Sequence, residues 1–242
     1  MAAQPTSIPA AKPWKKLRDL YRSGRLRMAV EGQVGNWIAA VGERLGSEKL
    51  MFNSFMFSGF HRGALETAPA ATASLLSMYP ELRTAVDLGC GTGVYMHELA
   101  SRGVDVIGFE YSARARQVAA QLYGVKVLPF DLHDFAGPGR ISDLCVCIEI
   151  AHYLPPALGD ALVGHCARGA PLVMFSAAHP GQHGYGHINA QPRSYWIERF
   201  KRQGLRFNQA ATQRLERELR SRLQRGFWLA DNVCLFDRPG GA

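Results

Sequence analysis

The stretch Val86-Asp87-Leu88-Gly89-Cys90-Gly91-Thr92-Gly93 decides the fold of this 242-residue chain. A strand pattern, Thr84–Leu88, precedes the glycines, and a helical pattern over residues 94–102 follows them. We therefore expect a strand, a tight turn and a helix in succession. Glycine lets the backbone turn sharply and approach a ligand closely, and the unpaired N–H groups at the start of a helix then face that ligand.

The alternation of strand and helix patterns continues after this loop. Strands separated by helices of about ten residues imply βαβ units and a mainly parallel sheet. The nearly continuous apolar run 144–150 is typical of a central strand that is buried on both faces. Further strands are expected at 104–109, 125–130 and 172–177, and helices at 113–123, 156–167 and 195–203.

The last part of the chain has a different pattern. Residues 205–210 and 229–236 are expected to be strands on either side of a charged helix, 213–224. Two strands around one helix at the end of the chain suit an antiparallel edge hairpin. We therefore predict an α/β fold with a doubly wound, seven-stranded, mostly parallel sheet, an antiparallel edge hairpin and an N-terminal helical extension.

Composition places the chain among ordinary globular proteins, with 47% hydrophobic and 20% charged residues. No apolar run is long enough to span a bilayer, and residues 1–11 lack the apolar core of a secretory signal. The five cysteines are scattered without a C-x-x-C pair, which is typical of reduced core thiols. We expect a cytoplasmic protein with no membrane span and no zinc site.

The net charge of +8 is concentrated in two segments, residues 12–27 and 193–225. Such basic stripes could attract nucleic acid, anionic lipid or an anionic substrate. We interpret them instead as solvated helix faces, and we expect no nucleic-acid partner.

The glycine loop does not fit the dinucleotide-binding pattern G-x-G-x-x-G, because the third glycine would fall at Met96 or Val94. The form D-x-G-x-G-x-G at 87–93 resembles the loop of class I S-adenosylmethionine-dependent methyltransferases. The resemblance implies S-adenosyl-L-methionine as methyl donor and S-adenosyl-L-homocysteine as product. It further implies a Rossmann-like methyltransferase domain.

The resemblance implies a role for acidic residues that end three successive strands. Asp87 would orient the methionine amino group, Glu110 would accept hydrogen bonds from the ribose diol, and Asp131 would meet the adenine amino group. Glu110 also lies about 20 residues after the loop, where an acidic residue is expected. The cofactor-binding residues implied in this way are Asp87, Gly89, Cys90, Gly91, Gly93, Glu110, Tyr111, Asp131, Leu132 and Glu149.

The fourth strand ends in Glu149-Ile150-Ala151-His152-Tyr153-Leu154-Pro155-Pro156, which looks like the family stretch E-V-x-E-H-L-P-P. Here His152 replaces the second Glu and Tyr153 replaces the His. Because this segment faces the transferred methyl group in the family, His152 or Tyr153 is a candidate catalytic general base. A base is not obligatory, since positioning alone can supply much of the rate. The alternative for His152 is packing on the cofactor or a hydrogen bond to the substrate.

Three histidines, His179, His183 and His187, lie four residues apart after the fifth strand. The glycines and the proline between them forbid a regular helix, so we predict no metal site and expect a loop that caps the active site. A loop that gathers the three histidines around a metal is the alternative. The run 187–196 looks like an H-x-N…Y-W element of a bacterial subset of these enzymes. The candidate substrate-contacting residues are His61, Arg62, His179, His183, His187, Asn189, Tyr195 and Trp196.

The region before the first strand is interpreted as a separate part. Residues 1–13 carry three prolines, and we expect them to be disordered; a loosely helical stretch and the apolar segment 51–60 follow. A helix is expected from about residue 64 to residue 79. We divide the chain into an extension, residues 1–62, and a methyltransferase domain, residues 63–242. The extension could form a lid, pack on the sheet or serve a homodimer.

Three functions are compatible with these features. We predict an enzyme that methylates an oxygen or nitrogen of a small-molecule acceptor, such as a natural product or a sugar-containing compound, in biosynthesis. An RNA- or protein-directed methyltransferase that uses the basic stripes is the alternative. Against it, the fourth strand does not end in the Asp/Asn-Pro-Pro-aromatic form of base-amino methyltransferases. The third is a non-catalytic cofactor-binding fold, which the intact acidic residues argue against.

Overall fold

The computed structural model describes residues 38, 41, 54–139, 141–182, 184 and 186–240. The expectations for residues 1–13 and for the loosely helical stretch after them therefore concern a part of the chain that is outside the described residues, apart from two isolated positions. The chain divides into two compact units, Met1–Met56 and Phe57–Ala242. The sheet lies in the second unit, so the fold is described from that unit alone.

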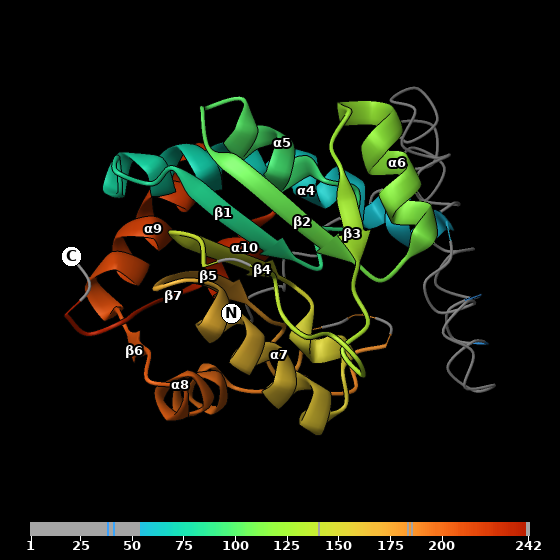
Figure 1. Cartoon of the computed structure of the whole chain (residues 1–242). Helices are drawn as coiled ribbons and strands as arrows, with labels where there is room; N and C mark the ends of the chain where they lie inside the picture. The colour runs from blue at the N-terminus through green and yellow to red at the C-terminus, as the bar shows by residue number, and fades with distance from the viewer. Residues whose placement is uncertain are drawn as a thin grey trace, which may run out of the picture. The chain divides into compact units, whose positions relative to one another are not determined.

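Seven strands form one mixed sheet in the order β3-β2-β1-β4-β5-β7-β6 (Figure 1). The bounds are β1 Thr84–Leu88, β2 Asp105–Glu110, β3 Val127–Pro129, β4 Leu144–Ile148, β5 Leu172–Ser176, β6 Arg206–Phe207 and β7 Cys234–Asp237. Strands β1 to β5 pair in parallel, while β7 is antiparallel to both β5 and β6. The predicted doubly wound sheet with an antiparallel edge pair is confirmed.

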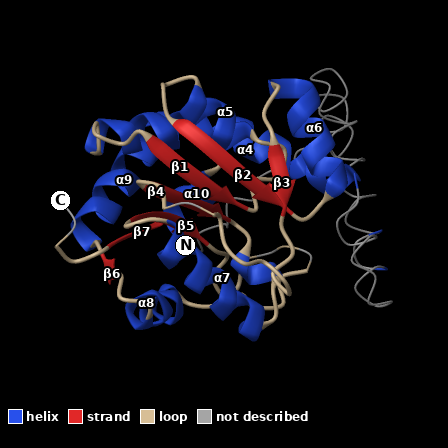
Figure 2. Cartoon of the chain, in the orientation of Figure 1, coloured by secondary structure: helices blue, strands red, loops and turns tan. Residues whose placement is uncertain are grey.

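Helices lie on both sides of the sheet (Figure 2). Their bounds are α4 Ser54–Met78, α5 Val94–Ala100, α6 Ala113–Tyr123, α7 Pro156–Gly169, α8 Arg193–Arg202, α9 Gln209–Arg222 and α10 Phe227–Asn232, and η1 Ala151–Tyr153 is a short 3₁₀ turn. In the described part of the chain, none of the helices is long and apolar enough to cross a membrane.

Strand β4 shows why its sequence is apolar throughout. Leu144 and Val146 face one core, which they share with side chains of α4, α5 and α9. Cys145 and Cys147 face the opposite core, formed with α7 and α8. Because successive strand residues point to opposite faces, a strand between two helix layers must be apolar at every position. Cys145 and Cys147 therefore share one face of the strand.

The C-terminal elements differ from the expectation. Residues 229–236 were predicted as one strand, but α10 ends at Asn232 and β7 begins at Cys234. Val233 still donates a backbone hydrogen bond to the Leu229 carbonyl at 2.8 Å, as in a helical turn, and both side chains are buried. A short apolar run does not distinguish helix from strand by its pattern, so the tertiary contacts decided the conformation.

The bounds of three further elements differ from the expectation. Strand β6 has two residues because the Asn208 side chain caps α9, accepting a hydrogen bond from the Ala211 amide at 3.0 Å. Helix α9 therefore begins at Gln209 instead of residue 213. Helix α4 begins at Ser54, ten residues before the expected start, and continues through the predicted domain boundary at 62. The division into extension and domain stays a prediction.

The sheet has a switch point between β1 and β4. From β1 the chain moves outward through β2 to β3, and it then returns to place β4 on the other side of β1. Ligands of open α/β sheets bind in the crevice outside the carboxyl ends of the strands at such a point. The glycine loop and the segment after β4 both lie at this edge.

Candidate functional site

The glycine loop adopts a backbone that other residues rarely accept. The φ angles of Gly89, Gly91 and Gly93 are 78°, 54° and 79°, all in the left-handed region. A Cβ atom on Gly89 would also lie 2.6 Å from the Cδ1 atom of Ile150, which follows β4. Conformation and space both require glycine at 89, and the loop packs directly against the segment after β4.

Glu110, at the end of β2, holds this loop. The Gly91 amide donates to Glu110 Oε2 at 3.0 Å, and the Ser112 amide donates to Oε1 at 2.7 Å. Burial raises the pKa of Glu110, and these hydrogen bonds oppose the rise. Each carboxylate oxygen can accept a second hydrogen bond, so Glu110 can hold the loop and still bind a ligand hydroxyl.

Asp87 is the most isolated carboxyl group of the site. Its side chain is 3% exposed, and Oδ2 has no hydrogen-bond partner within the described residues. Burial, and then the charge of Glu110, raises the pKa of Asp87 to about 8. A buried carboxylate without a partner is costly, so the position favours a cationic ligand group.

The end of β3 lies beside the end of β2. The Phe130 amide donates to the Glu110 carbonyl at 3.2 Å, which brings Asp131 and Leu132 to the same edge of the sheet. Asp131 Oδ1 accepts a hydrogen bond from the His133 amide at 3.0 Å, and Asp131 and Leu132 are both half-buried. The structure thus brings together the three strand ends that the sequence singled out. Tyr111, by contrast, is 56% exposed.

Glu149 has the single unusual backbone angle among the described non-glycine residues, a φ of 58°. Its amide donates to the carbonyl and hydroxyl oxygens of Ser176 at 3.0 and 3.1 Å. Its Oε1 accepts a hydrogen bond from Asn232 Nδ2 at 3.0 Å. Burial raises the pKa of Glu149 to about 7, against Asn232, Ser176 and the charge of His179, which lower it.

His152 is buried, with 1% of its side chain exposed. Its Nδ1 accepts a hydrogen bond from the Ala178 amide at 3.0 Å. The neutral ring therefore carries its proton on Nε2, which has no partner within the described residues. Burial, and then His187, lowers the pKa of His152 to about 3.

Aromatic rings surround His152. The ring centroids of Tyr153 and His187 both lie 4.2 Å from that of His152, and those of Tyr153 and His187 are 5.3 Å apart. Phe60 of α4 lies 6.0 Å from Tyr153. Burial raises the pKa of Tyr153. These rings form an aromatic wall at the carboxyl end of β4.

The loop after β5 closes over this wall. The Asn189 amide donates to the His152 carbonyl at 3.0 Å, and the Gln191 amide donates to the Ala178 carbonyl at 3.3 Å. Asn189 Oδ1 accepts from Gln191 Nε2 at 3.2 Å. These hydrogen bonds of Asn189 therefore hold the loop in place. His183 lies outside the described residues, which contain no cluster of three metal-ligating side chains.

The other candidate substrate residues are more dispersed. His61 Nδ1 lies 2.8 Å from the Thr92 hydroxyl, so His61 contacts the glycine loop, and Arg62 beside it is half-buried. Trp196 is 2% exposed and packs in the core against Phe175. Tyr195 lies under the Arg199 guanidinium at 3.2 Å. Their roles toward a substrate stay predictions.

A small pocket lies between the end of β5, α8 and α10. It is lined by Phe175, Ala177, His179, Gln191, Arg193, Trp196, Asp231, Asn232 and Cys234. Sequence reasoning missed Asn232 and Ser176, which meet Glu149 from distant parts of the chain. No motif marks them, because their importance comes only from the pairing of β4, β5 and β7.

Residues 85–169 match the protein family described as "Methyltransferase domain". The chain contains a class I S-adenosylmethionine-dependent methyltransferase domain. It is also similar to the magnesium-protoporphyrin O-methyltransferase of Rhodobacter capsulatus, with 28% identity over 114 residues. The aligned part covers 44% of this chain and 51% of that enzyme, so the similarity spans about half the length of the relative.

Solved methyltransferase structures share the fold of this domain. CalS10 of Micromonospora echinaspora, an amino pentose methyltransferase, matches with a TM-score of 0.57 and 16% identity over 76% of this chain and 96% of CalS10. The magnesium protoporphyrin IX methyltransferase ChlM of Synechocystis PCC 6803 matches with a TM-score of 0.55 and 19% identity over 77% of this chain and 96% of ChlM. At these identities the likeness concerns the fold.

Proposed function

We propose that this protein transfers the methyl group of S-adenosyl-L-methionine to an oxygen or nitrogen of a small-molecule acceptor. The observation that carries the proposal is the buried carboxyl of Asp87 beside the glycine loop, whose Oδ2 has no hydrogen-bond partner among the described residues. S-adenosylmethionine brings an ammonium group and a sulfonium, and a cationic ligand offsets the cost of burying this carboxylate.

The chain's own residues have distinct tasks in cofactor binding. Asp87 would receive the amino group, Glu110 the ribose hydroxyls, and Asp131 with the Leu132 amide the adenine ring. When bound, the cofactor supplies an electrophilic methyl group, so the protein's main contribution is to bring the acceptor atom into line and exclude water. The contact of Ile150 with Gly89 places the segment after β4, where the acceptor would bind, against the glycine loop.

His152 suits a hydrogen-bond donor better than a general base. A base must accept a proton, but Nδ1 already accepts the Ala178 amide and Nε2 carries the proton. The lowered pKa of about 3 keeps the ring neutral at physiological pH. We therefore assign His152 to donating a hydrogen bond to the acceptor and revise the base role expected from the sequence.

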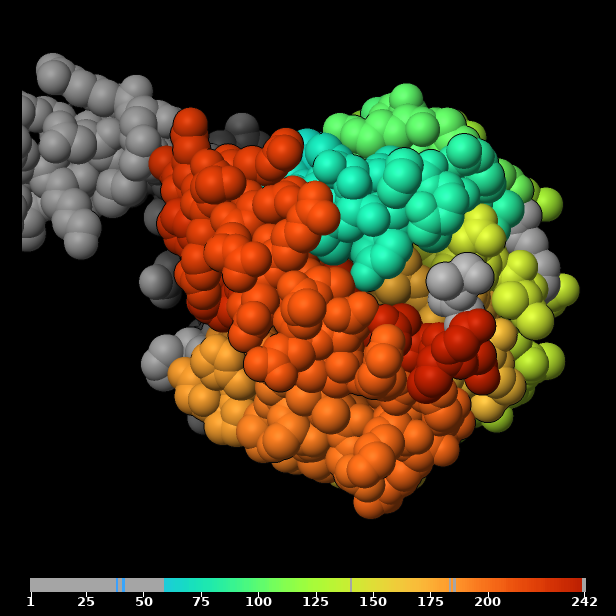
Figure 3. All heavy atoms as spheres, turned by 90° about the vertical axis from the view of Figure 1, so that its left-hand side faces the viewer, coloured from blue at the N-terminus to red at the C-terminus, as the bar shows by residue number. Residues whose placement is uncertain are grey.

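A small acceptor fits the surface charges better than nucleic acid does. Six of the ten cationic side chains between residues 193 and 225 form ion pairs: Arg193–Glu216, Arg199–Asp160, Arg202–Glu198, Arg206–Asp237, Arg214–Glu218 and Arg220–Asp231. Figure 3 shows the side of the molecule on which C-terminal residues, in orange and red, form a continuous surface. Paired charges release few counterions, so they contribute little to phosphate binding.

The relatives support an oxygen or nitrogen acceptor. The Rhodobacter capsulatus relative is an O-methyltransferase, and CalS10 is an amino pentose methyltransferase. The first name states an oxygen acceptor, and both names specify small-molecule substrates. The acceptor of this chain would therefore be a hydroxylated or amino-bearing metabolite that enters at the ends of β4 and β5.

Two measurements test the proposal. Calorimetry should detect binding of S-adenosylmethionine and S-adenosylhomocysteine to the full chain. The chain is also incubated with S-adenosylmethionine tritiated at the methyl group, in one tube with the fraction of a cell extract below 3 kDa and in another with the macromolecular fraction. Only the small-molecule fraction should become labelled. Label in RNA or protein would favour the alternative, and absence of cofactor binding would exclude both kinds of enzyme.

A further inference from the structure

With His152 assigned as a donor, Glu149 is a half-buried carboxyl placed to take a proton at the acceptor edge, the carboxyl ends of β4 and β5. It follows β4 directly and adjoins Ile150, which packs on the cofactor loop. Its left-handed backbone conformation, with a φ of 58°, is strained for a non-glycine residue. Such strain persists where the surroundings impose it, and it is concentrated at functional sites.

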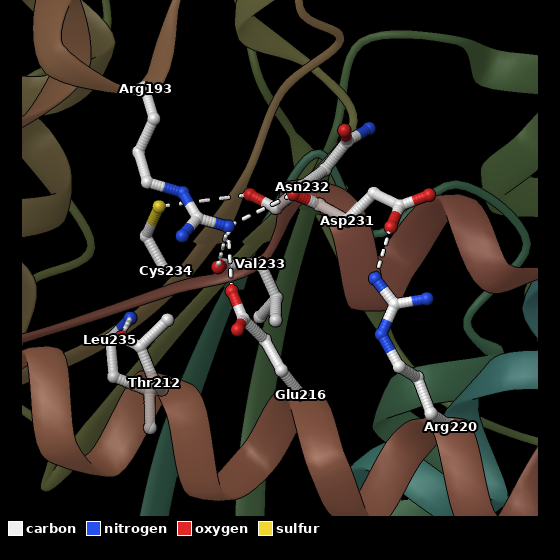
Figure 4. Close-up of polar contacts among 9 residues, drawn as sticks. All are labelled: Arg193, Thr212, Glu216, Arg220, Asp231, Asn232, Val233, Cys234 and Leu235. Atoms are coloured by element: carbon white, nitrogen blue, oxygen red, sulfur yellow. Dashed lines mark hydrogen bonds and ion pairs between the residues drawn. The ribbon is translucent and has the colours of Figure 1, made fainter.

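The helix that reaches Glu149 is held firmly in place. Arg193 Nη2 of α8 donates to Glu216 Oε1 of α9 at 2.7 Å and to the Asp231 carbonyl of α10 at 2.9 Å. Arg220 forms an ion pair with the Asp231 side chain. Figure 4 shows this cluster, with the Asn232 amide directed away from it. These polar contacts hold the end of α10, and none of them uses the Asn232 side chain.

Asn232 joins three segments at the acceptor edge. Its Nδ2 donates to Glu149 Oε1 and to Gln182 Oε1, both at 3.0 Å. Asn232 is 6% exposed, so solvent competes little for these bonds. One amide therefore orients the carboxyl after β4 and ties it to the loop after β5.

We propose that Glu149 accepts the proton of the methyl acceptor and that Asn232 is the residue that positions it. The inference rests on the proposed function and deepens it. A lone pair of the acceptor oxygen or nitrogen forms a bond to the methyl carbon. The carbon–sulfur bond breaks at the same time, and the electron pair of that bond stays on sulfur. The acceptor proton passes to the Glu149 carboxylate and from there to solvent.

The surroundings of Glu149 allow this role. The groups that interact electrostatically with it are the His179 imidazole, the phenols of Tyr95 and Tyr153 and the Cys147 thiol. None of these four is a permanent cation that would keep the carboxylate ionised and weakly basic. Asn232 and Ser176 are neutral groups whose hydrogen bonds lower the pKa of Glu149, and Asn232 also orients the carboxyl through its bond to Oε1.

The first test follows the Glu149 carboxyl directly. Glutamate labelled with ¹³C at the side-chain carboxyl is titrated by NMR in the complex with S-adenosylhomocysteine, with Glu149→Gln used to assign the signal. Asn232→Leu removes a donor to the charged form and should raise the midpoint by about one pH unit. Asn232→Asp adds a negative charge and should raise it further. Asp160→Asn, which removes an exposed carboxylate on α7 that pairs with Arg199, is the control and should leave the midpoint unchanged.

The second test measures the consequence. Glu149→Gln should retain the affinity for S-adenosylhomocysteine and lose methyl transfer to the extract fraction below 3 kDa, while Asn232→Leu should shift the pH profile of transfer toward alkaline pH. A Glu149→Gln variant as active as wild type, or one that loses cofactor affinity, would overturn the proposal, as would equal midpoints in Asn232→Leu and wild type. A wild-type chain that binds no cofactor would refute the proposed function itself.

Discussion

The two halves of the sheet's carboxyl edge are built in different ways. On the β1–β3 side, the cofactor edge, backbone amides of consecutive residues and the ends of successive strands make the site, as in the bond from Gly91 to Glu110. On the β4–β7 side, the acceptor edge, side chains from distant segments meet, as Glu149 does with Asn232. The first arrangement suits a constant ligand, and the second can change its ligand with few substitutions.

The largest effect is expected at the cofactor edge. Asp87→Asn should weaken S-adenosylmethionine binding about 100-fold by calorimetry, because the ammonium group loses a charged hydrogen-bond partner. An unchanged affinity would show that Asp87 does not meet the cofactor.

The same variant is expected to make the folded protein more stable in the absence of cofactor. The pKa of Asp87 is raised to about 8 from 3.8, so wild-type stability should fall as pH rises from about 4 to about 8 and then level off. Asp87→Asn lacks this term, so its melting temperature without cofactor should exceed that of wild type by a margin that grows over the same range. Weaker binding accompanied by a lower melting temperature would instead indicate misfolding.

A smaller loss is expected at the second strand end. Glu110→Gln should weaken cofactor binding about 30-fold, because it removes the charge that accepts the Gly91 amide and is proposed to bind the ribose hydroxyls. Asp105→Asn, at the opposite end of β2, is the control and should bind as wild type does. Equal affinities of the two variants would contradict the ribose assignment.

At the acceptor edge, substitutions should change turnover without changing cofactor affinity. His152→Asn keeps an acceptor near the Nδ1 position for the Ala178 amide but removes the Nε2 donor, and it should lower the rate of methyl transfer about tenfold. His152→Gln keeps a donor near Nε2 and should retain more activity while melting at a lower temperature. A loss of cofactor affinity in His152→Asn would assign His152 to cofactor packing.

The smallest effect tests how α4 supports the cofactor edge. Thr92→Val removes the hydrogen bond to His61 at 2.8 Å and should weaken cofactor binding about threefold in the same calorimetric titration. A loss comparable with that of Asp87→Asn would mean that α4 orders the whole loop, and the contrast between the two edges would then be weaker.

The cofactor edge was predictable because its determinants are local. The spacing of Asp87, the three glycines and Glu110 specifies a strand, a turn with left-handed angles and the next strand end, and the structure has all of them. The acceptor edge was predicted only in part. His152 was found from its place after β4, but its tautomer depends on the Ala178 amide, 26 residues away.

The sequence by itself determined the order of strands and helices, the cofactor loop and the family. Periodicity and glycine spacing encode these features, since each depends on neighbours within a few residues. Tertiary structure decided the end of α10 and the start of β7 within an apolar run, the core position of Trp196 and the meeting of Glu149 with Asn232, 83 residues apart. Such contacts arise from the antiparallel pairing of β7 with β5, which no local pattern specifies.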